Sequence, residues 1–231
     1  MRTQTVAYEV DGTRFEGLAV WDDEDTGARP GVLVAPTVMG RTAFEEGKAE
    51  ALARLGYVGL ALDIYGVGVR PTEMDEARRH MDSLNADRRL IAARMAAALA
   101  ALRGLDGVDA ARTAAIGFCF GGKCVLDLAR SGSDLLGVAT FHGLFDPPGI
   151  SVADRITAKV LALHGWDDPL AKPEDVIALA QELTDKGAIW ELDAYGHSEH
   201  GFTARHRPQM YRPLADARSW TRLTGFLAEL F

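Results

Sequence analysis

Two kinds of hydrophobic pattern alternate along the 231 residues of the chain. Short apolar runs rich in Val, Ile and Leu, bounded by Gly, Pro or Asp, predict β-strands. Longer segments in which apolar residues recur every three or four positions predict helices that bury one face. The expected strands occupy residues 5–10, 13–21, 31–36, 57–62, 113–116, 136–141, 160–164 and 188–195. The expected helices occupy residues 43–55, 87–102, 123–130, 173–186 and 214–231.

The order of these segments predicts the fold class. Asp11-Gly12 separates the first two strands and is a hairpin turn signal. From the third strand onward, strands alternate with helices, which predicts an α/β protein with a mostly parallel, twisted sheet and helices on both faces. The chain has no internal repeat, low-complexity segment or linker, so we expect residues 1–231 to form a single domain.

Two segments lie outside this alternation. Residues 22–27 form an acidic run that we interpret as a solvated turn rather than a cation site, because no metal-ligand spacing surrounds it. Residues 66–85 form a charged, turn-rich excursion after a strand, on the side of the sheet where open α/β proteins bind ligands. The excursion could line or cover a pocket, or it could be a solvated helix, and the pattern leaves both open.

Composition and charge narrow the class of partner. A hydrophobic fraction of 48% and a charged fraction of 25% are those of an ordinary globular protein. The formal net charge of −8 argues against nucleic acid or an anionic membrane as the main partner, although local arginines could still bind a small anion. The sequence shows no signal peptide and no apolar run that could cross a bilayer, and its two cysteines give no disulfide framework. We therefore expect a cytoplasmic location, with both a monomer and a homodimer open.

The strongest chemical motif is the stretch 117–122, Gly-Phe-Cys-Phe-Gly-Gly. It follows the apolar run at 113–116 and opens the helical segment at 123–130, which is the strand–turn–helix context of a nucleophile elbow. Such a turn needs glycines because strand and helix pack closely, and it holds its central residue in a strained conformation. We expect Cys119 to be the nucleophile rather than a buried apolar filler. Cys124 lies inside the following helix, where we expect a core side chain without a chemical role.

A cysteine nucleophile needs a base and a carboxylate that orients the base. In α/β-hydrolases the acid and then the histidine follow the nucleophile along the chain, each after a later strand. Asp167 and Asp168 follow the seventh expected strand, and Asp168 is the expected acid because the proline after it keeps it extended. His197 and His200 follow the last strand, and His200 is the expected base. Asp167 and His197 are the alternatives.

The oxyanion hole should come from backbone N–H groups at two places. One is the N–H of Phe120, which follows the nucleophile at the start of a helix. The other is the N–H of Val38, in the loop after the strand at 31–36. The positive end of the helix dipole should also lower the pKa of Cys119.

Three further residues follow strands on the catalytic side and could contact a substrate. They are Tyr65, His142 and His164. For the two histidines, a structural role with a hydrogen bond is the alternative. The six histidines show neither i, i+4 pairing nor cysteine partners, so we expect no metal site.

Together these motifs resemble the dienelactone hydrolase family. The matching stretches are Gly-Phe-Cys-Phe-Gly-Gly at 117–122, Gly-Trp-Asp-Asp at 165–168, His-Gly-Phe at 200–202, Leu-Gly-Tyr-Val-Gly-Leu-Ala-Leu-Asp-Ile-Tyr-Gly at 55–66 and Pro-Gly-Val-Leu-Val-Ala-Pro at 30–36. The resemblance spans residues 8–230 and implies an α/β-hydrolase fold without a large cap domain. It also implies hydrolysis of the lactone ring of carboxymethylenebutenolide and of related small esters, without a cofactor, by a triad of Cys119, His200 and Asp168.

The sequence departs from the family pattern at Thr37. The family usually carries a glutamate there, which contacts the resting cysteine and helps to deliver its thiolate. A threonine hydroxyl can contact a thiol or a substrate but cannot take a proton near neutral pH, so we expect His200 to deprotonate the cysteine directly. Glu45, Glu46 and Asp63 lie in nearby segments and are the candidates for a replacement carboxylate.

The family also grips the carboxylate of its substrate with arginines. Arg205 lies close to one matching position, and Arg78 and Arg79 lie in the excursion at 66–85. A bidentate arginine is a natural reader of a carboxylate. Solvated surface charge is the alternative for each of them.

The leading hypothesis is a cysteine hydrolase of small esters, lactones or thioesters that works through an acyl-thioester intermediate. A second is acyl transfer on the same triad, because nucleophiles other than water can intercept a thioester. A third, prompted by Thr37, is a catalytically weak ligand-binding protein with a hydrolase fold.

Overall fold

The computed structural model describes residues 1–23, 27–149 and 152–231. Its strands are β1 (Arg2–Val10), β2 (Thr13–Trp21), β3 (Arg29–Ala35), β4 (Val58–Ala61), β5 (Val108–Phe118), β6 (Gly137–Phe141), β7 (Lys159–Gly165) and β8 (Trp190–Tyr195). Its helices are α1 (Ala43–Ala53), α2 (Met74–Ala86), α3 (Arg88–Arg103), α4 (Phe120–Arg130), α5 (Pro173–Asp185) and α6 (Pro213–Leu230). None of the helices in these ranges is long and apolar enough to cross a membrane. Of the acidic run expected to be a solvated turn, residues 24–26 lie outside the described residues.

The strands form one sheet in the order β1-β2-β4-β3-β5-β6-β7-β8. Neighbours from β4 to β8 pair in parallel, whereas β2 pairs antiparallel with both β1 and β4. The turn between β1 and β2 has φ of 49° at Asp11 and 75° at Gly12, and two left-handed residues are what the favoured hairpin turn requires. The predicted hairpin and the predicted mostly parallel sheet are both confirmed.

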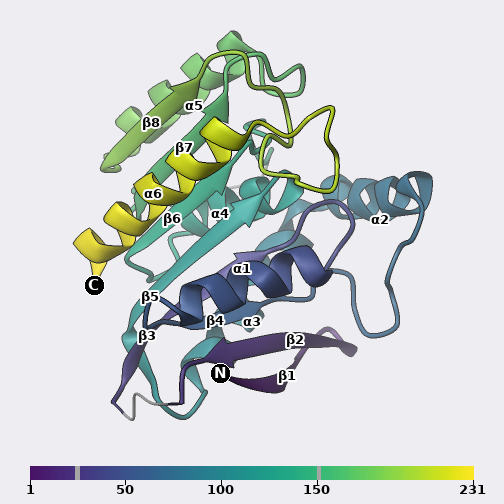
Figure 1. Cartoon of the computed structure of the whole chain (residues 1–231), viewed down its shortest axis with the longest axis vertical. Helices are drawn as coiled ribbons and strands as arrows, with labels where there is room; N and C mark the ends of the chain where they lie inside the picture. Colours follow the sequence, from purple (N-terminus) through teal and green to yellow (C-terminus); the bar gives the residue numbers. More distant parts are fainter. Residues whose placement is uncertain (24–26, 150–151) are drawn as a thin grey trace.

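Helices cover both faces of the sheet (Figure 1). One hydrophobic cluster joins α1 and α6 to one face, and a larger cluster joins α3, α4 and α5 to the other. This two-sided burial explains why most of the inner strands read as continuous apolar runs rather than as alternating ones. The arrangement brings the carboxyl ends of β3, β5, β6, β7 and β8, with the loops that follow them, to the same edge of the sheet.

Element boundaries differ from the expected ones where pairing or packing overrides the local pattern. β1 begins at Arg2 because its ladder with β2 runs on to Trp21. β5 extends back to Val108, which pairs with β3 before a register shift. Helix α1 ends at Ala53 rather than at the expected residue 55, and Leu55 is 44% exposed.

The excursion at 66–85 contains helix α2, which Figure 1 shows at the margin of the molecule. Of its side chains, only Ala77 and Leu84 are buried. None of residues 66–85 lines the cavity beside Cys119 that is described below. Of the two interpretations left open, the structure favours the solvated helix.

A buried ionic cluster connects three helices on the far side of the sheet from α1 and α6. Arg88 of α3 donates to both carboxylate oxygens of Asp127 in α4, over 2.6 and 2.7 Å, and to Asp146 over 2.7 Å. Arg130 donates to Asp127 over 3.2 Å and to Glu182 of α5 over 2.6 Å. Arg88, Asp127 and Arg130 are all buried, so these ion pairs fix how α3, α4 and α5 sit against one another.

Candidate active site

Cys119 sits in a sharp turn between β5 and α4, as the elbow motif predicts. Its φ of 57° and ψ of −117° place a non-glycine residue in a strained backbone conformation. A Cβ on Gly117 would lie 2.0 Å from the carbonyl oxygen of Gly121, and a Cβ on Gly121 would lie 2.2 Å from that of Ala35. Only glycine therefore lets α4 pack this closely against β5 and β3, which lifts the Cys119 side chain to the carboxyl edge of the sheet.

His200 and Asp168 meet beside the cysteine from the loops after β8 and β7. Nδ1 of His200 lies 2.8 Å from Oδ2 of Asp168, and both residues are buried. Oδ1 of Asp168 accepts the backbone N–H of Leu170 over 2.8 Å, which fixes the carboxylate. Nε2 of His200 has no hydrogen-bond partner among the described residues and is left for the cysteine or for a substrate.

The two alternative residues lie apart from this group. Nδ1 of His197 is 3.9 Å from Oδ2 of Asp167, and both side chains are at least half exposed. They form a surface pair that does not reach the cysteine. Of the alternatives weighed from the sequence, the geometry favours Asp168 over Asp167 and His200 over His197.

The environment of Cys119 lowers the pKa of its thiol. Burial raises this pKa, but the interaction with His200 and the backbone N–H groups of Phe120 and Val38 lower it by more. Both the close contact with the His200 ring and the positive charge of that ring favour the thiolate. Burial in turn lowers the pKa of His200, while Asp168 and Cys119 raise it, to about 10. These directions favour a thiolate–imidazolium pair near neutral pH.

The same two backbone N–H groups are those expected to form the oxyanion hole. Phe120 begins helix α4, and Val38 lies in the loop between β3 and α1. Both interact with the Cys119 sulfur. The two donors therefore lie close to the Cys119 sulfur, which is where an oxyanion hole would need them if this cysteine attacks a carbonyl.

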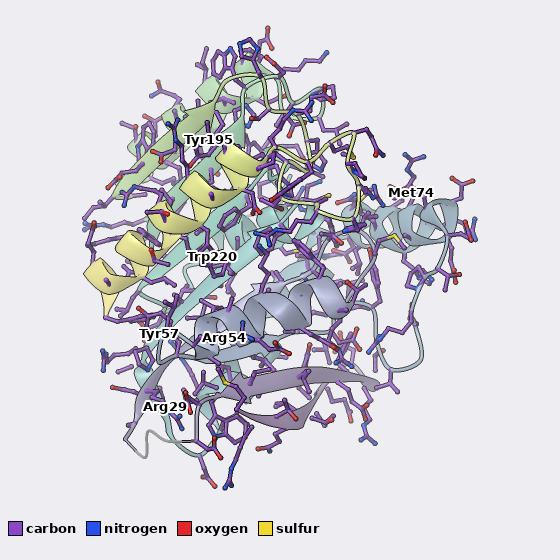
Figure 2. The ribbon with its side chains drawn as sticks, viewed as in Figure 1. Arg29, Arg54, Tyr57, Met74, Tyr195 and Trp220 are labelled. Carbon is purple, nitrogen blue, oxygen red and sulfur yellow. The ribbon has the colours of Figure 1, made fainter. Side chains whose placement is uncertain are left out.

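A cavity of about 1110 Å³ opens next to Cys119. Its walls come from the loop after β3, from α1 and α6, and from the segment that follows His200. Figure 2 shows Trp220 and Arg54, which both line it, on the face of the sheet covered by α6 and α1. Its charged lining among the described residues comprises four cations and one carboxylate, Lys48, Arg54, Arg205, Arg207 and Asp216. The cavity is thus locally basic in a protein whose net charge is −8.

Three of the seven residues that could contact a substrate line this cavity, and the other four, Tyr65, Arg78, Arg79 and His164, do not. Thr37, His142 and Arg205 are in its wall. Arg78 is not, because α2 holds it at the surface, 63% exposed and 3.8 Å from Asp75. Tyr65 is not either, since it is buried behind the loop after β3.

Arg205 lines the cavity, and its guanidinium is already paired with a carboxylate of the protein. Its Nε and Nη2 atoms donate to Oδ2 of Asp216 over 3.0 and 2.9 Å. Asp216 is buried and neutralises the guanidinium. The expectation that Arg205 reads a substrate carboxylate is therefore weakened by a partner that the sequence alone could not reveal.

The two strand-end histidines differ in role. His142, with φ of 39°, packs edge-on against His200 at 5.3 Å between ring centroids, and its Nε2 lies 2.8 Å from Oγ1 of Thr203. Burial lowers the pKa of His142 well below its usual value, so its ring is neutral beside His200. His164 is fully buried and lies outside the cavity lining, and neither of its ring nitrogens has a hydrogen-bond partner among the described residues. The structural hydrogen bond expected as the alternative exists for His142 and not for His164.

The sequence did not point to one residue of the site, Lys48, and did not separate another, Glu45, from two other candidates. The Nζ atom of Lys48 lies 4.8 Å from the Trp220 ring centroid and 3.9 Å from Asp216. Both of these residues belong to α6, so no pattern near Lys48 in the sequence could indicate these contacts. Glu45, only one of three candidate carboxylates, is fully buried and accepts the backbone N–H of Thr37 over 3.0 Å. Its signal was present as the capping-box pattern Thr-x-x-Glu at 42–45.

The other candidate carboxylates are engaged elsewhere. Glu46 is 2.7 Å from Arg41, and Asp63 accepts the backbone N–H groups of Tyr65 and Gly66. Among the described residues, no group of three or more His, Cys, Asp or Glu side chains could hold a metal ion.

Comparisons with known proteins place this geometry in a family. The model of the dienelactone hydrolase family matches residues 15–231. A Bradyrhizobium protein named probable 2-oxo-3-(5-oxofuran-2-ylidene)propanoate lactonase is 28% identical over 240 residues, which cover 98% of this chain and 96% of that protein. The solved structure of m3DLH is 38% identical with a TM-score of 0.93, over 100% of this chain and 98% of that one. The structure of the dienelactone hydrolase-like promiscuous phosphotriesterase P91, from metagenomic libraries, is 35% identical with a TM-score of 0.94 and the same coverage.

These similarities agree with the architecture and with the class of reaction. The whole-length structural match confirms the expected α/β-hydrolase fold, and no large cap domain stands over the sheet in the part of the chain that the structure describes. The family match covers nearly the whole chain, from the first hairpin to the last helix. The chain belongs to the dienelactone hydrolase family, and it is a hydrolase of ester bonds.

Proposed function

We propose that the protein hydrolyses small esters and lactones by covalent catalysis with Cys119 as nucleophile, His200 as acid and base, and Asp168 as the residue that orients His200. The observation that carries the proposal is the His200 ring, which is anchored at Nδ1 by Asp168 over 2.8 Å, has no hydrogen-bond partner for Nε2 among the described residues and acts on the Cys119 thiol. A ring held in this way presents one fixed nitrogen to the reacting atoms. The lowered pKa of the Cys119 thiol supports the same roles.

The first half of the reaction forms the acyl-enzyme. The Cys119 thiolate attacks the carbonyl carbon, and the carbonyl oxygen takes up negative charge beside the N–H groups of Phe120 and Val38. As the C–O bond breaks, the imidazolium of His200 gives its Nε2 proton to the leaving alkoxide. An ester releases an alcohol at this stage, whereas a lactone opens and keeps its new hydroxyl on the acyl group.

The second half returns the enzyme to its starting state. Neutral His200 takes a proton from water at Nε2, and the hydroxide attacks the thioester carbonyl through the same oxyanion hole. Collapse of this intermediate breaks the C–S bond and releases the carboxylic acid and the thiolate. The imidazolium formed beside Asp168 restores the thiolate–imidazolium pair.

The proposal is tested by replacing the nucleophile and trapping the intermediate. Cys119→Ala should abolish hydrolysis of 4-nitrophenyl acetate and of dienelactones, and wild-type enzyme quenched in acid should carry one acetyl group on the peptide containing Cys119. Cys124→Ala is the matched control and should retain activity, because Cys124 is fully buried in α4 and burial raises its pKa well above the usual value. Full activity in Cys119→Ala would exclude the mechanism.

The pH dependence of thiol labelling separates an enzyme from a weak ligand-binding protein. Because the pKa of Cys119 is lowered, iodoacetamide should label it with a midpoint below the ordinary thiol value of about 8.5. In His200→Asn the positive charge is lost while burial remains, so the midpoint should rise above that of the wild type. A wild-type midpoint at or above about 8.5 would favour the weak ligand-binding alternative.

A second candidate substrate class is the phosphotriesters. The observation that favours it is the 35% identity over the whole chain with P91, which is described as a promiscuous phosphotriesterase, together with a large, basic cavity beside Cys119. The thiolate would attack phosphorus and expel the aryloxide, and water would then release the dialkyl phosphate from sulfur. Turnover of methyl paraoxon that is lost in Cys119→Ala would support this activity, whereas no turnover above the buffer rate would exclude it.

A further inference from the structure

In the loop between β3 and α1, residues 37–42 carry the Val38 N–H proposed for the oxyanion hole, and one carboxylate binds both ends of this stretch. Oε1 of Glu45 accepts the backbone N–H of Thr37 over 3.0 Å. Oε2 of Glu45 accepts the backbone N–H of Thr42 over 2.9 Å and its hydroxyl over 2.6 Å. The same side chain therefore holds the first and the last residue of this stretch.

Helix capping explains only half of these contacts. The bonds between Glu45 and Thr42 form a capping box at the start of α1. The bond to Thr37 lies outside the box, because Thr37 is at the start of the loop, two residues after β3 ends, and directly precedes Val38. A capping glutamate usually stays near the surface, whereas Glu45 is 0% exposed. The extra bond and the burial indicate a task besides starting the helix.

A second contact fixes Val38 from its other side. The phenol of Tyr65 donates to the carbonyl oxygen of Val38 over 2.9 Å. Gly40, with φ of 73°, turns the loop so closely against Tyr65 that an added Cβ would lie 3.0 Å from its ring. Val38 is thus held between the bond that Glu45 makes to the preceding residue and the bond that Tyr65 makes to its own carbonyl.

We propose that Glu45 is a positioning residue that sets the Val38 N–H in the oxyanion hole, with Tyr65 as the second anchor. The inference rests on the proposed function. Glu45 acts through the backbone of the loop and not on the sulfur, since its hydrogen bonds within the described ranges run to Thr37 and Thr42. The buried carboxylate next to the site therefore does not replace the proton acceptor that is missing at Thr37.

The contacts of Glu45 require a carboxylate rather than another polar side chain of the same size. Both oxygens of Glu45 face N–H or O–H donors. An ionised carboxylate accepts at both oxygens, whereas the amide of glutamine accepts at one and would turn an N–H₂ group toward a second donor. Glu45→Gln should thus release one end of the loop while the size of the side chain stays the same.

The experiment compares Glu45→Gln with Glu46→Gln. Both changes remove one negative charge from the first turn of α1, but Glu46 pairs with the Arg41 side chain and not with the loop backbone. For 4-nitrophenyl acetate we expect kcat of Glu45→Gln to fall about ten- to hundredfold, because one oxyanion donor is worth about 10²- to 10³-fold and here is displaced rather than deleted. We expect KM to change by less than about twofold and Glu46→Gln to stay within about twofold of wild type in both constants.

The rate of alkylation of Cys119 distinguishes a positioning role of Glu45 from a merely structural one. Attack of Cys119 on iodoacetamide creates no oxyanion, so its rate at high pH, where the thiol is fully ionised, should be unchanged in Glu45→Gln. Tyr65→Phe, which keeps the ring and removes the bond to Val38, should lower kcat several-fold and likewise leave alkylation unchanged. This variant tests the anchoring of Val38 even if Glu45→Gln fails to fold.

Three outcomes would overturn the inference. They are an unchanged kcat in folded Glu45→Gln, an equal loss of kcat and alkylation rate, and, if Glu45→Gln does not fold, an unchanged kcat in Tyr65→Phe. The result is distinguishable from failure of the proposed function: hydrolysis that depends on Cys119 but not on Glu45 rejects only the positioning role. Absence of any Cys119-dependent hydrolysis in the wild type rejects the function itself.

Discussion

At the residue scale, two aspartates that are adjacent in the sequence have different surroundings and different expected roles. Asp168 is buried with its carboxylate 2.8 Å from Nδ1 of His200, whereas the Asp167 side chain is 50% exposed beside His197. Both follow β7 and both carry the same charge. What separates them is the direction in which the turn after β7 sends each side chain, so the two should respond differently to the same substitution.

We expect Asp168→Asn to lower kcat/KM for 4-nitrophenyl acetate by about 10²- to 10⁴-fold, because the amide neither fixes the His200 tautomer nor stabilises the imidazolium. The pKa of His200 should fall when this raising influence is lost, so the iodoacetamide midpoint of Cys119 should rise. Asp167→Asn is the matched control and should stay within about twofold, because an exposed pair contributes little. Equal losses in the two variants would reject Asp168 as the orienting acid.

At the scale of elements, the elbow between β5 and α4 depends on close packing of α4 against the sheet. Gly121 lets the first turn of α4 touch the end of β3, since a Cβ there would lie 2.2 Å from the Ala35 carbonyl oxygen and 2.7 Å from that of Pro36. The loop that carries Val38 begins at the next residue. A change at Gly121 should consequently displace both Phe120 and Val38, whose N–H groups are the proposed donors of the oxyanion hole.

Gly121→Ala should lower the free energy of unfolding by about 1–3 kcal/mol, the usual cost of overpacking. The shift of the β3 end should also lower kcat/KM by at least about tenfold, as sub-ångström displacements of a site do. The control is Gly225→Ala in α6, where an added Cβ meets nothing closer than 3.8 Å. That variant should gain about 0.5–1 kcal/mol from helix propensity. Urea denaturation measures the free energy of unfolding of both variants. An unchanged free energy of unfolding in Gly121→Ala would contradict the packing argument.

At the scale of the whole molecule, the cluster of Arg88, Asp127 and Arg130 fixes three helices on the face opposite the cavity. Two of these helices, α3 and α4, pack against β5 on that face, and α4 begins directly after Cys119. Burying such charges gives little net stability while they remain paired. Removing one partner is costly, because the remaining charge stays in a medium that solvates it poorly.

Arg88→Met should lower the free energy of unfolding by about 3–5 kcal/mol, because Asp127 loses its two-point partner and stays buried. For a chain of this length that corresponds to a fall in Tm of roughly 6–20 °C. Arg89→Met, one residue on in α3 and with a side chain that is 78% exposed, should change stability by less than about 0.5 kcal/mol. Calorimetry of the pair checks this, and similar Tm values for both variants would refute it.

The sequence determined by itself those features that depend on neighbours along the chain. These include the order of strands and helices, the Asp11-Gly12 hairpin and the glycine-flanked elbow, because hydrophobic period and glycine placement act over a few residues. It also limited the acid and the base to two candidates each, because the loop after a given strand is known once the strands are. The family resemblance added the reaction class, which the comparisons confirm.

Only the tertiary structure decided which side chains meet. Asp216 of α6 neutralises Arg205, α2 keeps Arg78 at the surface, and α6 places Trp220 over Lys48. Glu45 reaches back to Thr37, a contact that its capping pattern does not contain. Hydrogen bonds and ion pairs act over a few ångströms in space, and residues far apart or differently oriented in the chain come within that distance only when the helices dock on the sheet.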